Sequence, residues 1–360
     1  MAHAQTSGPE KGWLIIDGGG VPDEVKKRFV ALAGGSDANI VFIPTALSDE
    51  EMTAQGFFQG QGKGLARSWG INHITMLHTR DKARANSEYF IDVLRKASGV
   101  LIWGGRQWRL ADAYLDTAVE SEIKQLLARG GVVCGTSAGA TIQGSFLVRG
   151  DPKGNEIMMS PGHERGFGLL SNSAIDQHVN TREREHDLVA VIEKHPELLG
   201  LGIDEGAAII VHGDSFEVVG GQVAVHDGKE HEGAPYYFLS PGQTLNLKTR
   251  AVEQTLARNT PAPAAATGNS QASKYPVVLT VISAERTNHN GYTTTDIVGY
   301  LSDDPRKAQL HMVCDAGIFS RGPDGKANTY PARYSGKSHQ LKIGAREVGS
   351  DKVHEFTCKY

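Results

Sequence analysis

One serine stands among small residues, in the run Gly135-Thr136-Ser137-Ala138-Gly139, which matches the G-x-S-x-G pattern. An apolar run ends just before it, and a helix-compatible stretch begins at Ala138. A serine on such a strand-to-helix turn projects its hydroxyl at the carboxyl edge of a sheet. The N–H of Ala138 would then face a developing oxyanion. We therefore expect Ser137 to be a nucleophile. A plain tight turn or a phosphate-binding loop is the alternative, although no Lys-Ser/Thr pair follows.

A serine nucleophile needs a base and a group that orients the base. His178 follows a short apolar stretch and precedes a charged one, which is typical of a strand end. The apolar stretch at 201–203 likewise ends in two carboxylates. We predict His178 as the base and Glu205 as the orienting acid, with Asp204 as the alternative. A surface histidine and a solvated acidic turn remain the simpler interpretations.

The order of these residues along the chain is serine, histidine, acid. Ordinary α/β-hydrolases have the order serine, acid, histidine, so the chain order points away from lipases and esterases. A fourth apolar run ends in Gly104-Gly105-Arg106-Gln107. Two glycines allow a backbone N–H to approach a scissile carbonyl. We expect Gly105 to supply the second oxyanion donor and Gln107 to bind substrate, unless the segment is a simple turn.

The first 250 residues alternate strand-like and helix-like segments. Short apolar runs, most of them bounded by glycine, predict strands buried on both faces of a parallel sheet: residues 13–17, 39–44, 72–77, 99–103 and 131–135. Apolar residues at helical spacing predict helices between them, at 25–33, 89–96 and 111–129, with a weaker one at 54–69. This alternation predicts a doubly wound, mostly parallel α/β sheet flanked by helices, with ligands bound beyond the strands' carboxyl ends.

The pattern changes beyond residue 206. Residues 207–211, 216–219 and 222–226 read as short antiparallel strands that complete the same domain. A Pro/Ala/Gly/Ser-rich linker follows, and strand-like runs but no strong helical periodicity lie beyond it. We therefore divide the chain into a disordered start (1–11), a catalytic domain (12–258), a flexible linker (259–274) and a small β-rich C-terminal domain (275–360).

The bulk composition excludes several classes of protein. The chain has 360 residues, 39% hydrophobic and 22% charged, which is an ordinary globular balance. A net charge of −4 gives no sign of a nucleic-acid partner, and no apolar run approaches the length of a membrane span. The three cysteines lack metal-ligand spacing, which argues against a zinc site. We also expect no cofactor.

The cellular location rests on weaker signals. Ala2-His3-Ala4 matches an Ala-x-Ala cleavage pattern, although no hydrophobic stretch precedes it. Cys314 and Cys358 could pair, but sequence alone cannot show proximity. We expect a secreted or periplasmic protein, with a cytoplasmic one as the alternative. The oligomeric state stays open, with a homodimer as one arrangement.

Taken together, these motifs resemble the cyanophycinase and aspartyl-dipeptidase group of serine peptidases over residues 12–250. The matching elements occur in the family's order: Gly-Gly-x-Gln at 104–107, Gly-Thr-Ser-Ala-Gly-Ala at 135–140, Asp-Gln-His at 176–178 and Gly-Ile-Asp-Glu at 202–205. The resemblance implies a class-I glutamine-amidotransferase-like fold without a metal, and it implies the triad Ser137, His178 and Glu205. It assigns five residues to the substrate pocket: Gln107, Asp176, Gln177, Arg182 and Arg184.

Within that family, cyanophycinases hydrolyse a polymer that has an aspartate backbone and arginine on each side-chain carboxyl, releasing β-Asp-Arg dipeptides. The resemblance thus implies a peptide or cyanophycin-like polymer as substrate. Asp176 would pair with a substrate guanidinium or amine, and the two arginines would hold substrate carboxylates. Arg106, Val179 and Asp187 depart from the family pattern, the last standing where a third arginine is expected. The alternatives are a dipeptidase or isopeptidase for small Asp-containing peptides, and a non-catalytic ligand-binding module.

Overall fold

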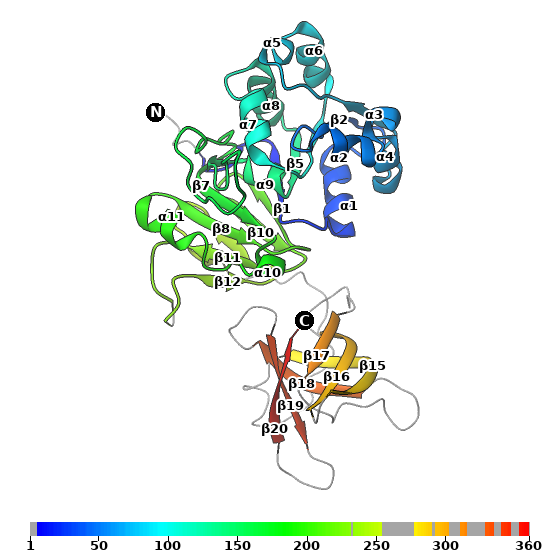
Figure 1. The fold of residues 1–360 in the computed structure, drawn as a ribbon, viewed down its shortest axis with the longest axis vertical. Helices are drawn as coiled ribbons and strands as arrows, with labels where there is room; N and C mark the ends of the chain where they lie inside the picture. The colour runs from blue at the N-terminus through cyan, green and yellow to red at the C-terminus, as the bar shows by residue number, and fades with distance from the viewer. Residues whose placement is uncertain are drawn as a thin grey trace. The chain divides into compact units, whose positions relative to one another are not determined.

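The computed structural model describes residues 6–231 and 233–253 with their side chains, and beyond them the backbone of strands at 277–289, 292–301, 310–314, 328–334, 340–346 and 353–359. The chain divides into two compact units, Met1–Leu256 and Ala257–Tyr360 (Figure 1). The predicted linker at 259–274 lies outside the described residues.

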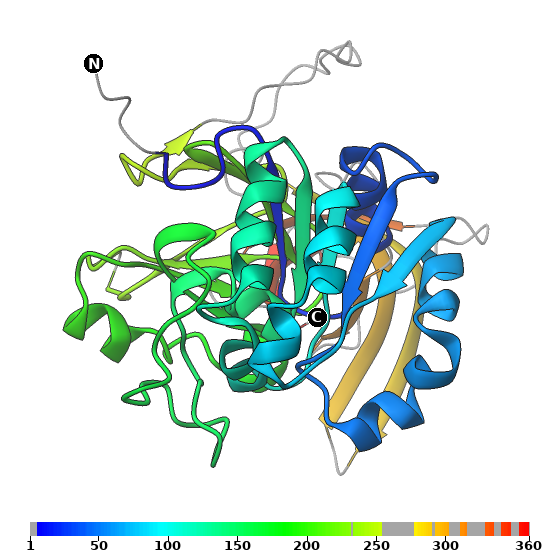
Figure 2. The ribbon, with the colours of Figure 1, turned by 90° about the horizontal axis from the view of Figure 1, so that it is seen from above.

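A nine-stranded sheet forms the centre of the first unit, in the order β14-β13-β10-β9-β1-β5-β4-β2-β3. Its parallel half matches the five predicted strands: β1 (Trp13–Asp17), β2 (Asn39–Ile43), β3 (His73–Met76), β4 (Gly99–Ile102) and β5 (Val132–Thr136). Antiparallel strands extend it on the other side of β1: β9 (Ala208–His212), β10 (Ser215–Val219), β13 (Thr244–Asn246) and β14 (Val252–Glu253). β2 and β3 lie side by side at one edge (Figure 2).

Helices cover both faces of this sheet (Figure 1). Successive residues of β1 face opposite sides, so Leu14 and Ile16 belong to one buried cluster and Ile15 to the other. The first cluster includes residues of α6 (Glu88–Lys96), α7 (Gln107–Tyr114) and α8 (Ala118–Ala128). The second includes residues of α1 (Asp23–Leu32), α2 (Asp49–Ala54), α3 (Phe57–Gly60) and α4 (Lys63–Trp69). The predicted doubly wound, mostly parallel α/β architecture is confirmed.

A second sheet, in the order β12-β11-β8-β7-β6, positions the downstream motifs. Its strands are β6 (Gly144–Phe146), β7 (Leu170–Gln177), β8 (Leu199–Ile203), β11 (Val223–His226) and β12 (Tyr237–Leu239). β6, β7 and β8 are parallel, so β7 and β8 end at the same edge. The short helices are α5 (Lys82–Ala85), α9 (Ala138–Thr141), α10 (Val179–Arg182) and α11 (Val189–Lys194).

Two helix predictions were wrong in extent. The predicted helix 111–129 is two helices, because the chain breaks after Tyr114 and Asp116 adopts a positive φ of 62°. The predicted helix 54–69 is interrupted twice: α2 ends at Ala54, and α3 and α4 are separate short helices. Gly56 and Gly62 stand in left-handed conformation before α3 and α4.

The described strands of the second unit close into a barrel, in the order β15-β16-β17-β20-β19-β18. Their bounds are β15 (Val277–His289), β16 (Tyr292–Leu301), β17 (Leu310–Cys314), β18 (Asn328–Tyr334), β19 (Gln340–Arg346) and β20 (Val353–Lys359). The register of β17 and β20 places Cys314 opposite Cys358. Among the described residues of the whole chain, no helix is long and apolar enough to cross a bilayer.

Candidate active site

Ser137 occupies a sharp turn between β5 and α9. Its backbone has φ 53° and ψ −116°, a sparsely populated conformation for a residue with a side chain. The Ser137 N–H donates to the carbonyl of Asp17 at 2.9 Å, which ties the turn to the end of β1. The surrounding structure therefore holds a strained backbone at the residue predicted as nucleophile.

His178 stands at the end of β7 and contacts both of its predicted partners. Its Nε2 lies 2.9 Å from the hydroxyl oxygen of Ser137, and its Nδ1 lies 2.9 Å from Oε2 of Glu205. Glu205 follows the end of β8, where its N–H donates to the side-chain oxygen of Asn180 at 2.7 Å. Thr181 donates a further hydrogen bond to Oε2 of Glu205 at 3.1 Å. Three segments far apart in sequence thus form one chain of hydrogen bonds, and Glu205 rather than Asp204 contacts the imidazole.

The protonation states suit a base and its orienting acid. Burial lowers the pKa of His178 below its usual 6.5, although the hydrogen bond that the imidazole donates to Glu205 opposes the shift. Burial acts to raise the pKa of Glu205, but hydrogen bonds from His178 and Thr181 outweigh it, and the pKa is lowered. Near neutral pH the imidazole is therefore neutral and the carboxylate ionised, which is the state in which His178 can accept a proton.

The loop after β4 lies against the serine. A Cβ placed on Gly104 would be 3.1 Å from Cβ of Ser137, so a side chain at this position would crowd the serine. The next residue, Gly105, is exposed, and Arg106 N–H anchors the loop on the carbonyl of Ala46 at 2.8 Å. The loop thus brings Gly104 against Ser137, and Gly105 follows it directly, while Ala138 begins α9.

Four of the five residues expected in the substrate pocket are buried. Gln107 is fully buried and its Nε2 donates to the carbonyl of Val148 at 3.0 Å. Asp176, Gln177 and Arg184 are 0%, 3% and 4% exposed. Arg184 donates to the carbonyl of Gln177 at 3.2 Å. Only Arg182, on α10, is exposed.

No sequence motif indicated which residue pairs with Asp176. Arg149, 1% exposed, donates from Nε to Oδ1 of Asp176 at 2.8 Å and from Nη2 to Oδ2 at 2.9 Å. Asp187, the residue that departs from the family's arginine, accepts a short hydrogen bond from the same Nη2. No sequence motif surrounds Arg149, so the cluster of Arg149, Asp176 and Asp187 became visible only in the structure. In this structure the carboxylate expected to bind a substrate cation is already paired.

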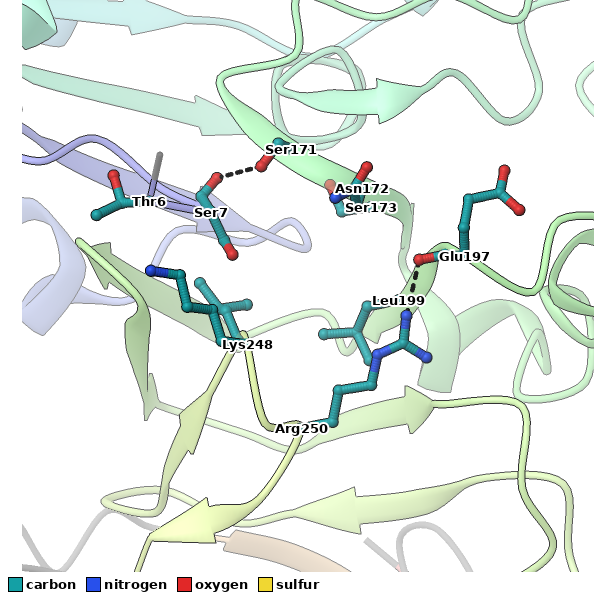
Figure 3. A pocket seen from close by; sticks show the side chains of 10 residues that line it. Thr6, Ser7, Ser171, Asn172, Ser173, Glu197, Leu199, Lys248 and Arg250 are labelled. Atoms are coloured by element: carbon teal, nitrogen blue, oxygen red, sulfur yellow. Dashed lines mark hydrogen bonds between the residues drawn. The ribbon is translucent and has the colours of Figure 1, made fainter. Parts of the chain in front are cut away.

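A polar hollow of about 490 Å³ lies elsewhere in the first unit. Figure 3 shows Arg250 donating to the carbonyl of Glu197 at 2.7 Å and Ser171 donating to the carbonyl of Ser7 at 2.9 Å. The hollow opens at the amino ends of β7 and β8, opposite the ends that lead to His178 and Glu205. It is therefore separate from the candidate active site. Within the described residues, no cluster of His, Cys, Asp or Glu has the arrangement of a metal site.

Comparison with known proteins gives a consistent result. A family model described as peptidase family S51 matches residues 14–219. A cyanophycinase of Trichormus variabilis is 31% identical over 265 residues, which cover 66% of this chain and 86% of the relative. A cyanophycinase of Geminocystis herdmanii is 30% identical over 212 residues, covering 57% and 75%.

A solved structure supports the fold. The crystal structure of a peptidase from an acI-B1 Actinobacterium matches with a TM-score of 0.52 at 23% identity, covering 66% of this chain and 98% of the other. At this identity the likeness shows the fold alone.

Proposed function

Because the chain belongs to peptidase family S51, we propose that it hydrolyses Asp-containing amide bonds through an acyl-enzyme on Ser137. The family and the cyanophycinase relatives make it a serine peptidase of the cyanophycinase and peptidase E type. The observation that carries the proposal is the hydrogen-bonded chain from Ser137 through His178 to Glu205, with both distances 2.9 Å.

In the proposed mechanism, Ser137 Oγ attacks the scissile carbonyl while Nε2 of His178 takes the hydroxyl proton. Glu205 holds the imidazole through Nδ1 and stabilises the imidazolium that forms. The N–H groups of Gly105 and Ala138 bind the tetrahedral oxyanion. His178 then protonates the departing amine, and a water molecule repeats the sequence to release the acid.

For the substrate, we propose cyanophycinase-like release of β-Asp-Arg dipeptides from a cyanophycin-like polymer. The support is the identity to two cyanophycinases and the match of the catalytic motifs. A second candidate is a dipeptidase or isopeptidase acting on small Asp-containing peptides. The pairing of Asp176 with Arg149 favours it, because the carboxylate is not free to receive a substrate guanidinium.

Incubation with cyanophycin and, separately, with Asp-X and β-Asp-X peptides, followed by mass spectrometry of the products, distinguishes the two. β-Asp-Arg released from the polymer supports the first candidate. Turnover of the peptides alone supports the second.

A pair of serine variants tests whether Ser137 is the nucleophile. Ser137→Ala is expected to abolish turnover and labelling by a fluorophosphonate, whereas Ser121→Ala, at an exposed position of α8, leaves both intact. Wild-type turnover by Ser137→Ala would refute the acyl-enzyme.

A further inference from the structure

Residues 17–20, which are the last residue of β1 and the turn after it, contact each of the three segments that form the candidate triad; we call them the loop 17–20. Its carbonyls accept backbone hydrogen bonds from all three: Ser137 N to Asp17 O at 2.9 Å, His178 N to Gly18 O at 3.0 Å, and Gly206 N to Gly19 O at 2.7 Å. Ser137 and His178 are thus held through their own N–H groups, and Glu205 is held through the N–H of the next residue, Gly206. No other part of the site joins all three segments in this way among the hydrogen bonds described.

Gly19 forms the surface against which the imidazole of His178 rests. A Cβ placed there would lie 2.3 Å from Cε1 and 2.5 Å from Nδ1 of that ring, closer than real contacts allow. Its φ of +131° also disfavours a side chain. The edge of the histidine that carries the hydrogen bond to Glu205 is thus in van der Waals contact with the backbone of Gly19.

The carboxyl of Asp17 holds this loop in place. It is fully buried, and its Oδ1 accepts from the N–H of Gly19 at 3.0 Å and from the hydroxyl of Thr136 at 2.7 Å. Thr136 directly precedes Ser137. One oxygen therefore links the peptide under the imidazole to the residue before the nucleophile.

The other carboxyl oxygen, Oδ2, is buried without a hydrogen-bond partner among the described residues. Burial raises the pKa of Asp17 to about 7. Keeping such a group in the interior costs free energy, which a purely structural position would avoid with an apolar or amide side chain.

We propose that the loop 17–20 is the template that aligns the three catalytic residues, with Gly19 as the support of His178 and Asp17 as a positioning residue. Neither residue touches the reacting atoms. The loop acts through the geometry of the hydrogen bonds between Ser137, His178 and Glu205, so the inference rests on the proposed function.

The first test compares two glycines that have similar backbones and different neighbours. Gly34 has φ +108° and a Cβ placed on it would meet nothing within 4 Å. Gly19→Ala must displace the imidazole, and a shift of about 1 Å is expected to lower kcat about 100-fold. KM is expected to stay unchanged, because the lost interaction is made in the transition state. Gly34→Ala is expected to keep the wild-type kcat.

The inference fails if Gly19→Ala is as active as Gly34→Ala. That outcome is distinct from a failure of the proposed function, which requires Ser137→Ala to remain active. Far-UV circular dichroism of both glycine variants shows that they share the native fold. The rate of fluorophosphonate labelling, measured without substrate, is expected to fall in parallel with kcat for Gly19→Ala only.

The second test examines Asp17. Asp17→Leu removes the acceptor for two hydrogen bonds and leaves buried donors unpaired, so kcat is expected to fall roughly 10- to 100-fold at constant KM. Asp17→Asn keeps an acceptor oxygen and is expected to recover most of that loss. If Asp17→Leu does not fold, Thr136→Val takes its place in the test. This variant removes only the hydrogen bond from Thr136 to Asp17 and is expected to lower kcat roughly 2- to 10-fold. Wild-type kcat in Thr136→Val, or equal kcat in the two Asp17 variants, would overturn the role of the carboxyl.

Discussion

Arg149 and Asp176 form a two-point ion pair that is removed from solvent. Nε and Nη2 of the guanidinium lie 2.8 and 2.9 Å from the two carboxylate oxygens, and the side chains are 1% and 0% exposed. Asp176 stands two residues before His178, so the pair lies at the strand end that leads to the candidate base. Asp187 also binds this guanidinium, and the carbonyl of Asn155 accepts from its Nη1 at 2.8 Å. Arg149 therefore donates hydrogen bonds to three residues, of which Asp176 is fully buried.

We predict that Arg149→Met destabilises the first unit strongly. The substitution leaves the buried Asp176 carboxylate with Arg184, 3.9 Å away, as its remaining counter-charge. Breaking a buried pair in this way costs roughly 3–5 kcal/mol. Urea unfolding followed by circular dichroism measures the loss. Arg95→Met serves as the reference, because the pairs of that arginine are exposed and worth less than about 1 kcal/mol. Equal losses in the two variants would contradict the prediction.

The acid limb of the pH–rate profile should respond to Glu205. The pKa of His178 lies below 6.5, so we expect kcat/KM to fall only as pH drops through a midpoint below that value. The hydrogen bond and charge of Glu205 raise this pKa, so Glu205→Gln should move the limb to still lower pH. It should also lower kcat by roughly 10³- to 10⁴-fold, as the loss of a triad carboxylate does.

Glu183→Gln provides a nearby exposed carboxylate for comparison. Its profile is expected to coincide with that of the wild type. A limb that shifts to higher pH in Glu205→Gln would mean that the acid does not stabilise the imidazolium.

The strands and the residues at their ends could be predicted from sequence, because both depend on local patterns. A buried parallel strand reads as an apolar run, and Ser137 and Glu205 follow such runs directly. The break between α7 and α8 was missed, because the helical spacing of apolar residues continues across it while Asp116 turns the backbone.

The network around Arg149 depends on long-range contacts. Residues 149, 176 and 187 come from a loop, a strand end and a second loop. Their approach is set by the second sheet, which no local pattern specifies. The same reason explains why Asp17 was missed: its partner Thr136 is 119 positions away in sequence.

The register of the barrel makes a disulfide between Cys314 and Cys358 testable. Residues directly opposite in antiparallel strands have Cα atoms roughly 4.5–5.5 Å apart, within the range that a disulfide spans. We predict a cross-linked peptide pair in a non-reducing digest of protein produced under oxidising conditions. Cys134 is buried and free, so it should be alkylated only after unfolding. Two alkylated thiols at 314 and 358 without reductant would contradict the prediction.

The stability of the first unit should fall as pH rises from about 4 to about 7, because of Asp17. Its pKa rises from 3.8 to about 7 on folding, chiefly through burial, with the charge of Glu205 adding to the effect against hydrogen bonds from Thr136 and Gly19. Between these values the folded state binds the proton and the unfolded state does not. The stabilisation is thus complete below pH 3.8 and lost above about pH 7.

Asp17→Asn removes this dependence, since an amide does not titrate. Relative to wild type, its free energy of unfolding should therefore rise between pH 4 and pH 8, by up to roughly 4 kcal/mol at 1.36 kcal/mol per pH unit. Denaturant unfolding at a series of pH values measures the difference. Asp23→Asn is the control at an exposed position. Because Lys26 lowers the pKa of the Asp23 carboxyl, removing that carboxyl should not raise the free energy of unfolding at alkaline pH. Parallel curves for Asp17→Asn and wild type would contradict the prediction, because they would show that Asp17 is ionised in the folded protein throughout this pH range.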